Sequence, residues 1–180
     1  MSEGPHGGQD SRPAEEPGPG SGRDPRGDTY TWYRRGLDLL GKGSAAAAAQ
    51  LLGRAAEAEP ASRSVLEALG RAQFDTGRYT AAAESFRRIV EASPSDDYAH
   101  FGLGLALARS GNPAGAAEHL ALAAAMRPEL RHYTDALRGV RATLRARQEA
   151  GSGSPDAGSE PGAADAGEPP PDDWPEGGRA

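Results

Sequence analysis

The segment Gly36–Lys42 comes closest in its spacing to a known reactive motif. Its two glycines and its lysine match a phosphate-binding loop up to the lysine, which Ser or Thr should follow. Residue 43 is glycine instead, and Ser44 comes one position late. A phosphate loop also follows a buried strand, whereas this segment ends an amphipathic helix whose leucines are needed for packing. The sequence therefore favours a helix end here over a nucleotide site.

Other catalytic and metal-binding patterns are missing from the sequence. The four histidines, His6, His100, His119 and His132, show no spacing that is typical of metal ligands. The chain has no cysteine for thiol chemistry or disulfides, and no serine lies in a Gly-x-Ser-x-Gly elbow. The sequence therefore predicts no catalytic residue, no metal site and no cofactor, and we do not expect an enzyme.

Arginines form a stripe towards the end of the core, at Arg131, Arg138, Arg141 and Arg145. Such a stripe attracts phosphate backbones or acidic proteins. It also suits the C-terminal end of a helix and keeps an outer helix face soluble. We favour the second interpretation, because residues 29–150 hold 16 basic against 13 acidic residues and no aromatic residue is interleaved with these arginines. Binding of nucleic acid or an acidic surface through this stripe is the alternative function.

These residues must be positioned by a chain that repeats itself every 34 positions. Pro60, Pro94 and Pro128 each close one of three similar segments. Four other sets recur at the same interval: Gly36, Gly70 and Gly104; Gly43, Gly77 and Gly111; Ala48, Ala82 and Ala116; and Leu52, Phe86 and Leu120. Glycine inside a helix costs roughly 1 kcal/mol relative to alanine, so a glycine repeated at one register indicates close helix packing. We expect the glycine of each first helix to lie against the alanine of the second.

The pattern resembles the tetratricopeptide repeat (TPR), which has this period, a Leu-Gly pair, an alanine, a large apolar residue and a closing proline. The middle segment matches best, at Leu69, Gly70, Gly77, Tyr79, Ala82, Phe86 and Pro94. The resemblance implies an all-α fold, a right-handed α–α superhelix of seven helices. The expected boundaries are repeats at 29–62, 63–96 and 97–130 and a capping helix at 129–149.

The predicted capping helix carries an apolar stripe, formed by Leu130, Tyr133, Leu137, Val140 and Leu144. A repeat array leaves its last helix pair with an exposed apolar face, which this stripe would cover. The same spacing would also serve as a seam between two protomers. The sequence therefore predicts a monomer or a weak dimer.

The two ends of the chain differ from the core in composition. Residues 1–28 and 151–180 are rich in Gly, Pro, Ser, Asp and Glu and contain a single aromatic, Trp174. We predict that both are disordered tails, and that the second is acidic, because such segments bury too little apolar surface to fold. The chain shows no signal peptide and no long apolar run, so we expect a cytoplasmic protein with no membrane partner. Its bias to Ala, Gly, Pro and Arg is typical of a bacterial gene.

The resemblance also implies a binding surface, because the first helices of TPR repeats line a concave face that holds a partner peptide. The corresponding residues are Tyr30, Tyr33, Leu37, Arg71, Phe74, Tyr98, Phe101, Leu105 and Arg109. The lysine and asparagine clamp of chaperone-binding members is absent from this chain. We therefore expect an adaptor or scaffold for another protein, whose apolar segment presents one or two acidic groups to Arg71 and Arg109.

The C-terminal tail contains a candidate ligand for the same face. Trp174 lies among prolines and acidic residues in the segment 169–176, and a bulky aromatic among acids would complement an aromatic groove with two arginines. A tail that only keeps the protein soluble is the other interpretation, and the sequence leaves both open.

Overall fold

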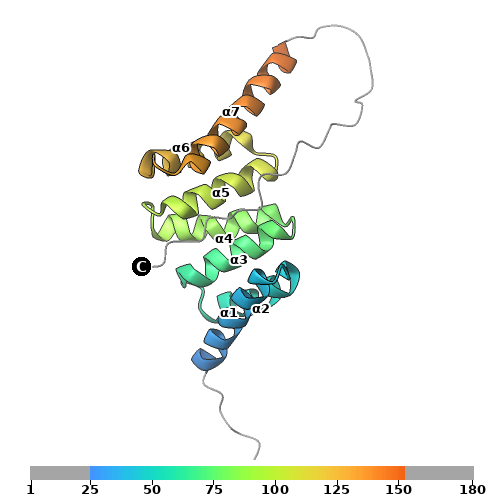
Figure 1. Ribbon diagram of the computed structural model, residues 1–180, viewed down its shortest axis with the longest axis vertical. Helices are drawn as coiled ribbons and strands as arrows, with labels where there is room; N and C mark the ends of the chain where they lie inside the picture. The colour runs from blue at the N-terminus through green and yellow to red at the C-terminus, as the bar shows by residue number, and fades with distance from the viewer. Residues whose placement is uncertain (1–24, 153–180) are drawn as a thin grey trace, which may run out of the picture.

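The computed structural model describes residues 25–152, which form seven α-helices and no strand. The helices are α1 (Pro25–Gly41), α2 (Ala45–Ala58), α3 (Arg63–Asp75), α4 (Tyr79–Ala92), α5 (Asp97–Arg109), α6 (Pro113–Met126) and α7 (Arg131–Ser152) (Figure 1). Each helix packs mainly against the one before and the one after it. The result is the expected right-handed α–α superhelix, in which α1, α3 and α5 are the first helices of three repeats.

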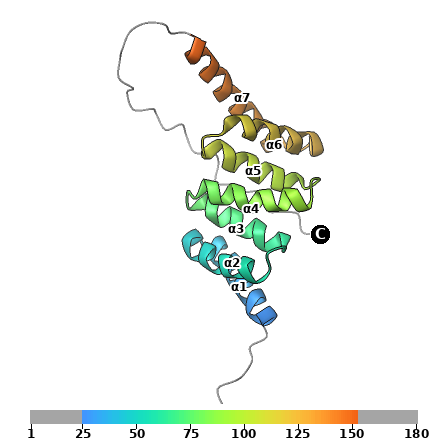
Figure 2. The same ribbon diagram turned by 180° about the vertical axis from the view of Figure 1, so that it is seen from behind.

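The first and last helices extend into the segments that the sequence analysis assigned to the tails, and most of both tails lies outside the described residues. The α1 helix begins at Pro25, three residues before the predicted end of the N-terminal tail, and α7 ends at Ser152, just beyond the predicted start of the C-terminal tail. In both views the C-terminal part of α7 extends beyond the stack (Figure 1; Figure 2). Its side chains after Leu144 are exposed where the structure describes them.

The turn inside each repeat contains a glycine with a left-handed backbone. The φ angles of Gly43, Gly77 and Gly111 are 73°, 74° and 91°, a region that side chains with a Cβ atom rarely occupy. In the middle repeat the Gly77 N–H donates to the Phe74 carbonyl over 2.9 Å, and the Arg78 N–H donates to the Gln73 carbonyl over 2.8 Å. These two bonds satisfy the last carbonyls of the helix.

Two of the later helices begin with a side-chain cap. Asn112 accepts a hydrogen bond from the Gly115 N–H over 3.0 Å, and Pro113 occupies the first turn, where its missing N–H costs no helical hydrogen bond. Asp96 caps α5 by accepting from the Ala99 N–H over 2.9 Å. Ser44 occupies the capping position of α2, but its side chain makes no capping bond.

The repeated glycines accommodate the large residue of the second helix, not its alanine. A Cβ atom on Gly36 would lie 2.6 Å from Leu52, and one on Gly104 would lie 2.6 Å from Leu120. Our expectation that each glycine meets the repeated alanine was therefore wrong. The large residue lies one helical turn beyond that alanine, and a bulky side chain reaches across the interface where a methyl group does not.

Two hydrophobic cores run through the stack. The first core joins α2, α3, α4 and α5 and includes the fully buried Leu52 and Phe86. The second core lies between α5, α6 and α7, and it contains Leu120 and Tyr133. Tyr133, Leu137 and Val140 are at most 9% exposed. The apolar stripe of α7 is thus largely buried within its own chain, which is the arrangement expected of a capping helix.

None of the described helices combines the length and the hydropathy that a membrane-spanning segment requires.

Candidate functional site

A groove of about 530 Å³ lies on the face formed by the first helices of the repeats. Its walls come from α1, α3, α5, α7 and the turn between α6 and α7. We call it the concave groove, and it is lined by Tyr33, Leu37, Arg63, Ser64, Glu67, Ala68, Arg71, Asp97, Tyr98, Arg127, Leu130, His132 and Tyr133. Three guanidinium groups and two carboxylates among these residues make it a largely polar groove.

Four of the predicted site residues line this groove together. Tyr33 and Leu37 come from α1, Arg71 from α3 and Tyr98 from α5. Tyr33, Leu37 and Tyr98 also pack against the first core. The structure therefore brings residues from three repeats to one surface, although they are far apart in the sequence.

Two other predicted residues lie at the opposite end of the same helices. Phe74 and Arg109 are near the C-terminal ends of α3 and α5, and both contact Tyr79 at the start of α4. The Phe74 ring meets the Tyr79 ring edge-on at 5.2 Å, and Arg109 donates to the Tyr79 hydroxyl over 3.0 Å. The Arg109 guanidinium carbon also lies 5.2 Å from the centre of the Tyr79 ring. These contacts join two repeats outside the concave groove.

The remaining predicted residues are divided between the core and the surface. Phe101 is only 5% exposed and stacks on Tyr133, with ring centres 4.4 Å apart. Leu105 is half-buried against the second core. Tyr30, in contrast, is 64% exposed and does not line the concave groove. Of the five aromatics among the predicted site residues, Tyr33 and Tyr98 line the concave groove.

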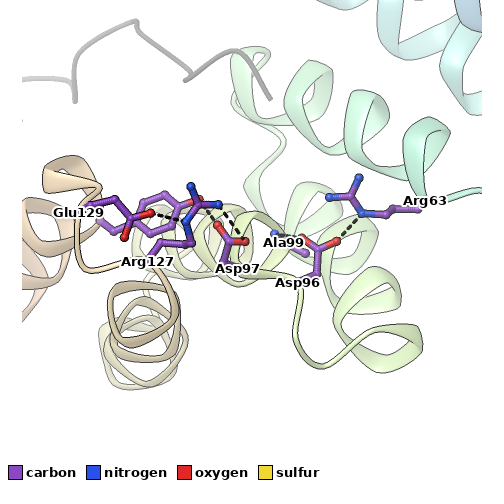
Figure 3. Close-up of polar contacts among 7 residues, drawn as sticks. Arg63, Asp96, Asp97, Ala99, Arg127 and Glu129 are labelled. Carbon is purple, nitrogen blue, oxygen red and sulfur yellow. Dashed lines mark hydrogen bonds and ion pairs between the residues drawn. The ribbon is translucent and has the colours of Figure 1, made fainter. Parts of the chain in front are cut away.

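Two neighbouring aspartates at the start of α5 hold one arginine from the start of α3 and one from the turn after α6 (Figure 3). Arg63, from the start of α3, bonds Asp96 and also pairs with Glu67 at 3.2 Å. On the other side, Arg127 lies 4.0 Å from Asp97 and pairs with Glu129. These contacts fix one edge of the concave groove.

Burial raises the pKa of three side chains in the groove, Glu67, Tyr98 and Tyr133. Burial raises the pKa of Glu67, although the positive charge of Arg63 opposes this shift. Burial also raises the pKa of Tyr98 and of Tyr133, and the hydrogen bond from the Tyr133 hydroxyl to Asp97, 3.0 Å long, adds to the second shift. Both phenols therefore keep their protons at neutral pH.

The sequence interpretation missed the groove residues near helix starts. Arg63, Asp97, Leu130 and Tyr133 lie at the first turns of α3, α5 and α7 or just before them, and Arg127 lies in the turn that follows α6. The predicted positions are distributed along the whole length of the first helices. The 34-residue register contained a signal for two of these residues. Arg63 and Asp97 are 34 residues apart, and each comes directly before another groove residue of its helix.

The arginine stripe lies on α7, away from most of the concave groove. Arg131, Arg138, Arg141 and Arg145 are all exposed. Arg138 pairs with Asp135 of its own helix at 2.7 Å. These arginines lie on the solvent-exposed outer face of α7, next to its buried apolar residues.

Two histidines form a pair that their spacing did not predict. The Nδ1 atoms of His100 in α5 and His119 in α6 are 3.0 Å apart, and the Nε2 atom of His100 is 3.0 Å from the Pro94 carbonyl. His100 is 4% exposed. Among the residues that the structure describes, no three histidine or acidic side chains gather in a way that could hold a metal ion.

The chain belongs to the tetratricopeptide repeat family. A family model described as Tetratricopeptide repeat matches residues 33–97 and 94–129, which together span more than half of the chain. The resemblance seen in the sequence is thereby confirmed. No curated protein matches the chain.

Solved structures show the same fold at low sequence identity. The first TPR domain of Spaghetti (RPAP3), bound to the HSP90 peptide SRMEEVD, is 16% identical, with 66% of this chain and 94% of that chain covered and a TM-score of 0.62. The Sgt2 TPR domain from Aspergillus fumigatus is 22% identical, with 77% and 92% covered and a TM-score of 0.61. An O-GlcNAc transferase mutant from Thermobaculum terrenum is 22% identical, with 66% of this chain but 23% of that chain covered and a TM-score of 0.58. These similarities confirm the predicted all-α superhelix.

Proposed function

We propose that this protein is a scaffold that binds a segment of another protein in the concave groove. The observation that carries the proposal is the convergence of Tyr33, Arg71 and Tyr98, from three repeats, on one polar groove. Tyrosine and arginine are the side chains most often responsible for binding energy at protein interfaces. The HSP90 peptide held by the similar RPAP3 domain supports a peptide as the kind of ligand.

The groove lining also suggests the chemistry of the partner segment. Arg71 offers a guanidinium to a carboxylate, while Tyr33 and Leu37 offer apolar surface to a side chain beside it. Glu67 and Asp97 would repel a segment with many acidic residues. The best ligand is therefore a segment with one acidic group next to apolar residues, and Arg109 is not expected to contact it.

The proposal is for binding without catalysis. The similarity to an O-GlcNAc transferase concerns less than a quarter of that protein, and a shared fold does not transfer an activity. Arg63, Arg127 and Tyr133 of the groove are held in ion pairs or a hydrogen bond with neighbouring carboxylates, an arrangement that suits recognition.

Charge reversal at Arg71 tests the proposal. The intact chain, an Arg71→Glu variant and an Arg71→Met variant are used to capture proteins from a cell lysate. Arg54→Glu is the matched control, because Arg54 is exposed on α2 and lies outside the groove. A groove ligand is retained by the intact chain and by Arg54→Glu, and its affinity for Arg71→Glu falls by about tenfold or more, since hydrogen bonds to charged groups contribute roughly 1.5–3 kcal/mol.

A crosslinking experiment identifies the contact directly. Because the chain has no cysteine, a Ser64→Cys variant places a single thiol-directed crosslinker in the groove, and Arg54→Cys places one outside it. Captured proteins that crosslink from position 64 alone support the proposal. Equal capture by all variants, with equal crosslinking from both positions, would refute it.

A further inference from the structure

In a longer array α7 would be the first helix of a fourth repeat. The second helix of that repeat would pack against the outer face of α7. Residue 138 is 34 positions after Gly104, and in the three repeats this glycine leaves space for Leu52, Phe86 or Leu120. At position 138 the chain has arginine. A long side chain fills the space into which a fourth helix would pack, so the array ends here with one helix face uncovered by another helix.

This face combines positive charge with apolar surface. Arg138, Arg141 and Arg145 line a shallow recess together with Leu137 and Leu144. The Arg138 side chain is 74% exposed despite its pair with Asp135. Within residues 25–152, neither Arg141 nor Arg145 makes an ion pair. The face therefore suits an acidic, extended chain, not a helix.

We propose that the C-terminal segment of this same chain, residues 153–180, docks on the arginine face of α7. The segment contains seven acidic residues and a single arginine, Arg179. Six prolines among its residues oppose helix formation and favour an extended chain. Asp172, Asp173 and Glu176 surround Trp174, so carboxylates can meet the arginines while the indole covers the half-buried Leu144.

The connection between the two parts is short enough for this contact. Arg138 and Ser152 are 14 residues apart along α7, which corresponds to about 21 Å of helix. The acidic cluster begins 20 residues beyond Ser152, and a Gly-rich coil of that length has a root-mean-square span of roughly 25 Å. The effective concentration of such a tethered segment is on the order of millimolar, so even weak binding occupies the face.

Charge favours α7 over the concave groove as the docking surface. The groove contains Glu67 and Asp97, and Asp96 and Glu129 lie at its edge. These four carboxylates outnumber the three arginines of the groove, whereas α7 carries five arginines against two acidic residues, Asp135 and Glu149. The docked segment would also compete with nucleic acid for the same arginines. The proposal is independent of what the groove binds.

The absence of cysteine allows a direct test in the full chain. A nitroxide is attached to a Gly177→Cys variant, and paramagnetic broadening of the backbone amide signals is measured by NMR. We expect the signals of residues 138–145 to be lost and those of residues 63–71 in the groove to be retained. Raising the salt from 0.01 M to 1 M shortens the Debye length from about 30 Å to about 3 Å, and the signals should then return.

Charge-reversal variants provide the matched control. Arg141→Glu with Arg145→Glu should restore the α7 signals at low salt. Arg54→Glu with Arg78→Glu makes the same change in charge on exposed arginines elsewhere and should not restore them. The proposal would be overturned if the groove signals were lost instead. Equal broadening along the whole chain would also overturn it, as would α7 broadening that neither salt nor either pair of substitutions changes.

Discussion

At the scale of single residues, Phe86 explains why two glycines are needed on neighbouring helices. Its ring is fully buried, and it inserts between α3 and α5. A Cβ atom on Gly70 would lie 2.8 Å from this ring, and one on Gly102 would lie 2.6 Å from it. The ring cannot move away from one glycine without approaching the other. The benefit of close packing therefore exceeds the helix-propensity cost of both glycines.

Alanine substitutions distinguish packing glycines from a tolerated one. We expect Gly70→Ala to lower the free energy of unfolding by about 1–3 kcal/mol, because it overpacks the core around Phe86. Gly53→Ala should raise it by about 0.5–1 kcal/mol, since no atom lies within 4 Å of the added Cβ and the residue is inside α2. Urea unfolding followed by circular dichroism measures both. A gain in stability from Gly70→Ala would contradict this account of Phe86.

The histidine pair has a defined proton arrangement. The Pro94 carbonyl can only accept, so the Nε2 atom of His100 carries a proton and donates a hydrogen bond to it, while the Nδ1 atoms of His100 and His119 share a second hydrogen bond. Burial lowers the pKa of His119, and His100 adds to this effect. The folded protein therefore holds His119 in its neutral form more strongly than the unfolded chain does.

This shift predicts a loss of stability in mild acid. Below about pH 6.5, the ordinary value for histidine, the unfolded chain takes up a proton at His119 that the folded protein resists. The free energy of unfolding then falls as the pH decreases towards the lowered folded pKa. Between pH 7 and pH 5 we expect the free energy of unfolding to fall less in the His119→Gln variant than in the intact protein, as measured by urea unfolding. Parallel pH profiles for the two proteins would show that the pair does not couple folding to pH.

At the scale of elements, the start of α5 joins the second repeat to the third. Asp96 caps its own helix through Ala99 and pairs with Arg63 of the preceding repeat, and Asp97 contacts Arg127 after α6. Burial of Asp96 by itself raises the pKa of its carboxyl, but the Arg63 guanidinium and the Ala99 N–H outweigh this and hold the pKa below its usual value. One helix terminus thus fixes the edge of the groove.

Two substitutions at Asp96 separate the cap from the ion pair. Asp96→Asn keeps an acceptor for Ala99 and loses the charge, and we expect a cost of at most about 1 kcal/mol because Arg63 is half exposed. Asp96→Ala should cost about 1 kcal/mol more, because the cap is also lost. The difference between Asp96→Asn and the intact protein should shrink below about pH 4, as the aspartate becomes protonated. Thermal unfolding over that pH range measures these differences, and equal stability of the two variants would contradict a capping role.

At the scale of the whole molecule, the stack is held by contacts between neighbouring helices. The α7 helix contacts α6 and α5 but not α1 or α2. In such an array stability is the sum of repeat and interface contributions, and a defect weakens mainly its own surroundings. A substitution in the second core, which α7 completes with Tyr133, should therefore destabilise that core more than the first core.

Removal of the Tyr133 ring tests this local behaviour. Tyr133 is 1% exposed and stacks on Phe101, so we expect Tyr133→Ala to cost about 3 kcal/mol or more. Relative to the intact protein, hydrogen exchange measured by mass spectrometry should increase more in α5, α6 and α7 of this variant than in α1 and α2. Tyr133→Phe, which loses only the bond to Asp97, should cost about 1 kcal/mol. A uniform increase in exchange along the chain would instead indicate a single cooperative unit.

The repeat pattern of the sequence determined the fold. Prolines, glycines, alanines and large apolar residues that recur every 34 positions specify local helices, turns and neighbour contacts. Local patterns suffice for this because a repeat array has no long-range connections to guess. Tyr33, Leu37, Arg71 and Tyr98 were predicted in the groove for the same reason, since their register places them on the first helices.

Only the tertiary structure decided which exposed positions form a site and which are packing. Phe101 and Phe74 have a register similar to that of the groove residues, but Phe101 stacks on Tyr133 from α7 and Phe74 meets Tyr79 from α4. Arg63 and Arg127 reach the groove because the start of α5 offers each an aspartate. Such contacts depend on which side chains of neighbouring helices are within reach of one another. That information is in the packing of helices, and a 34-residue register does not contain it.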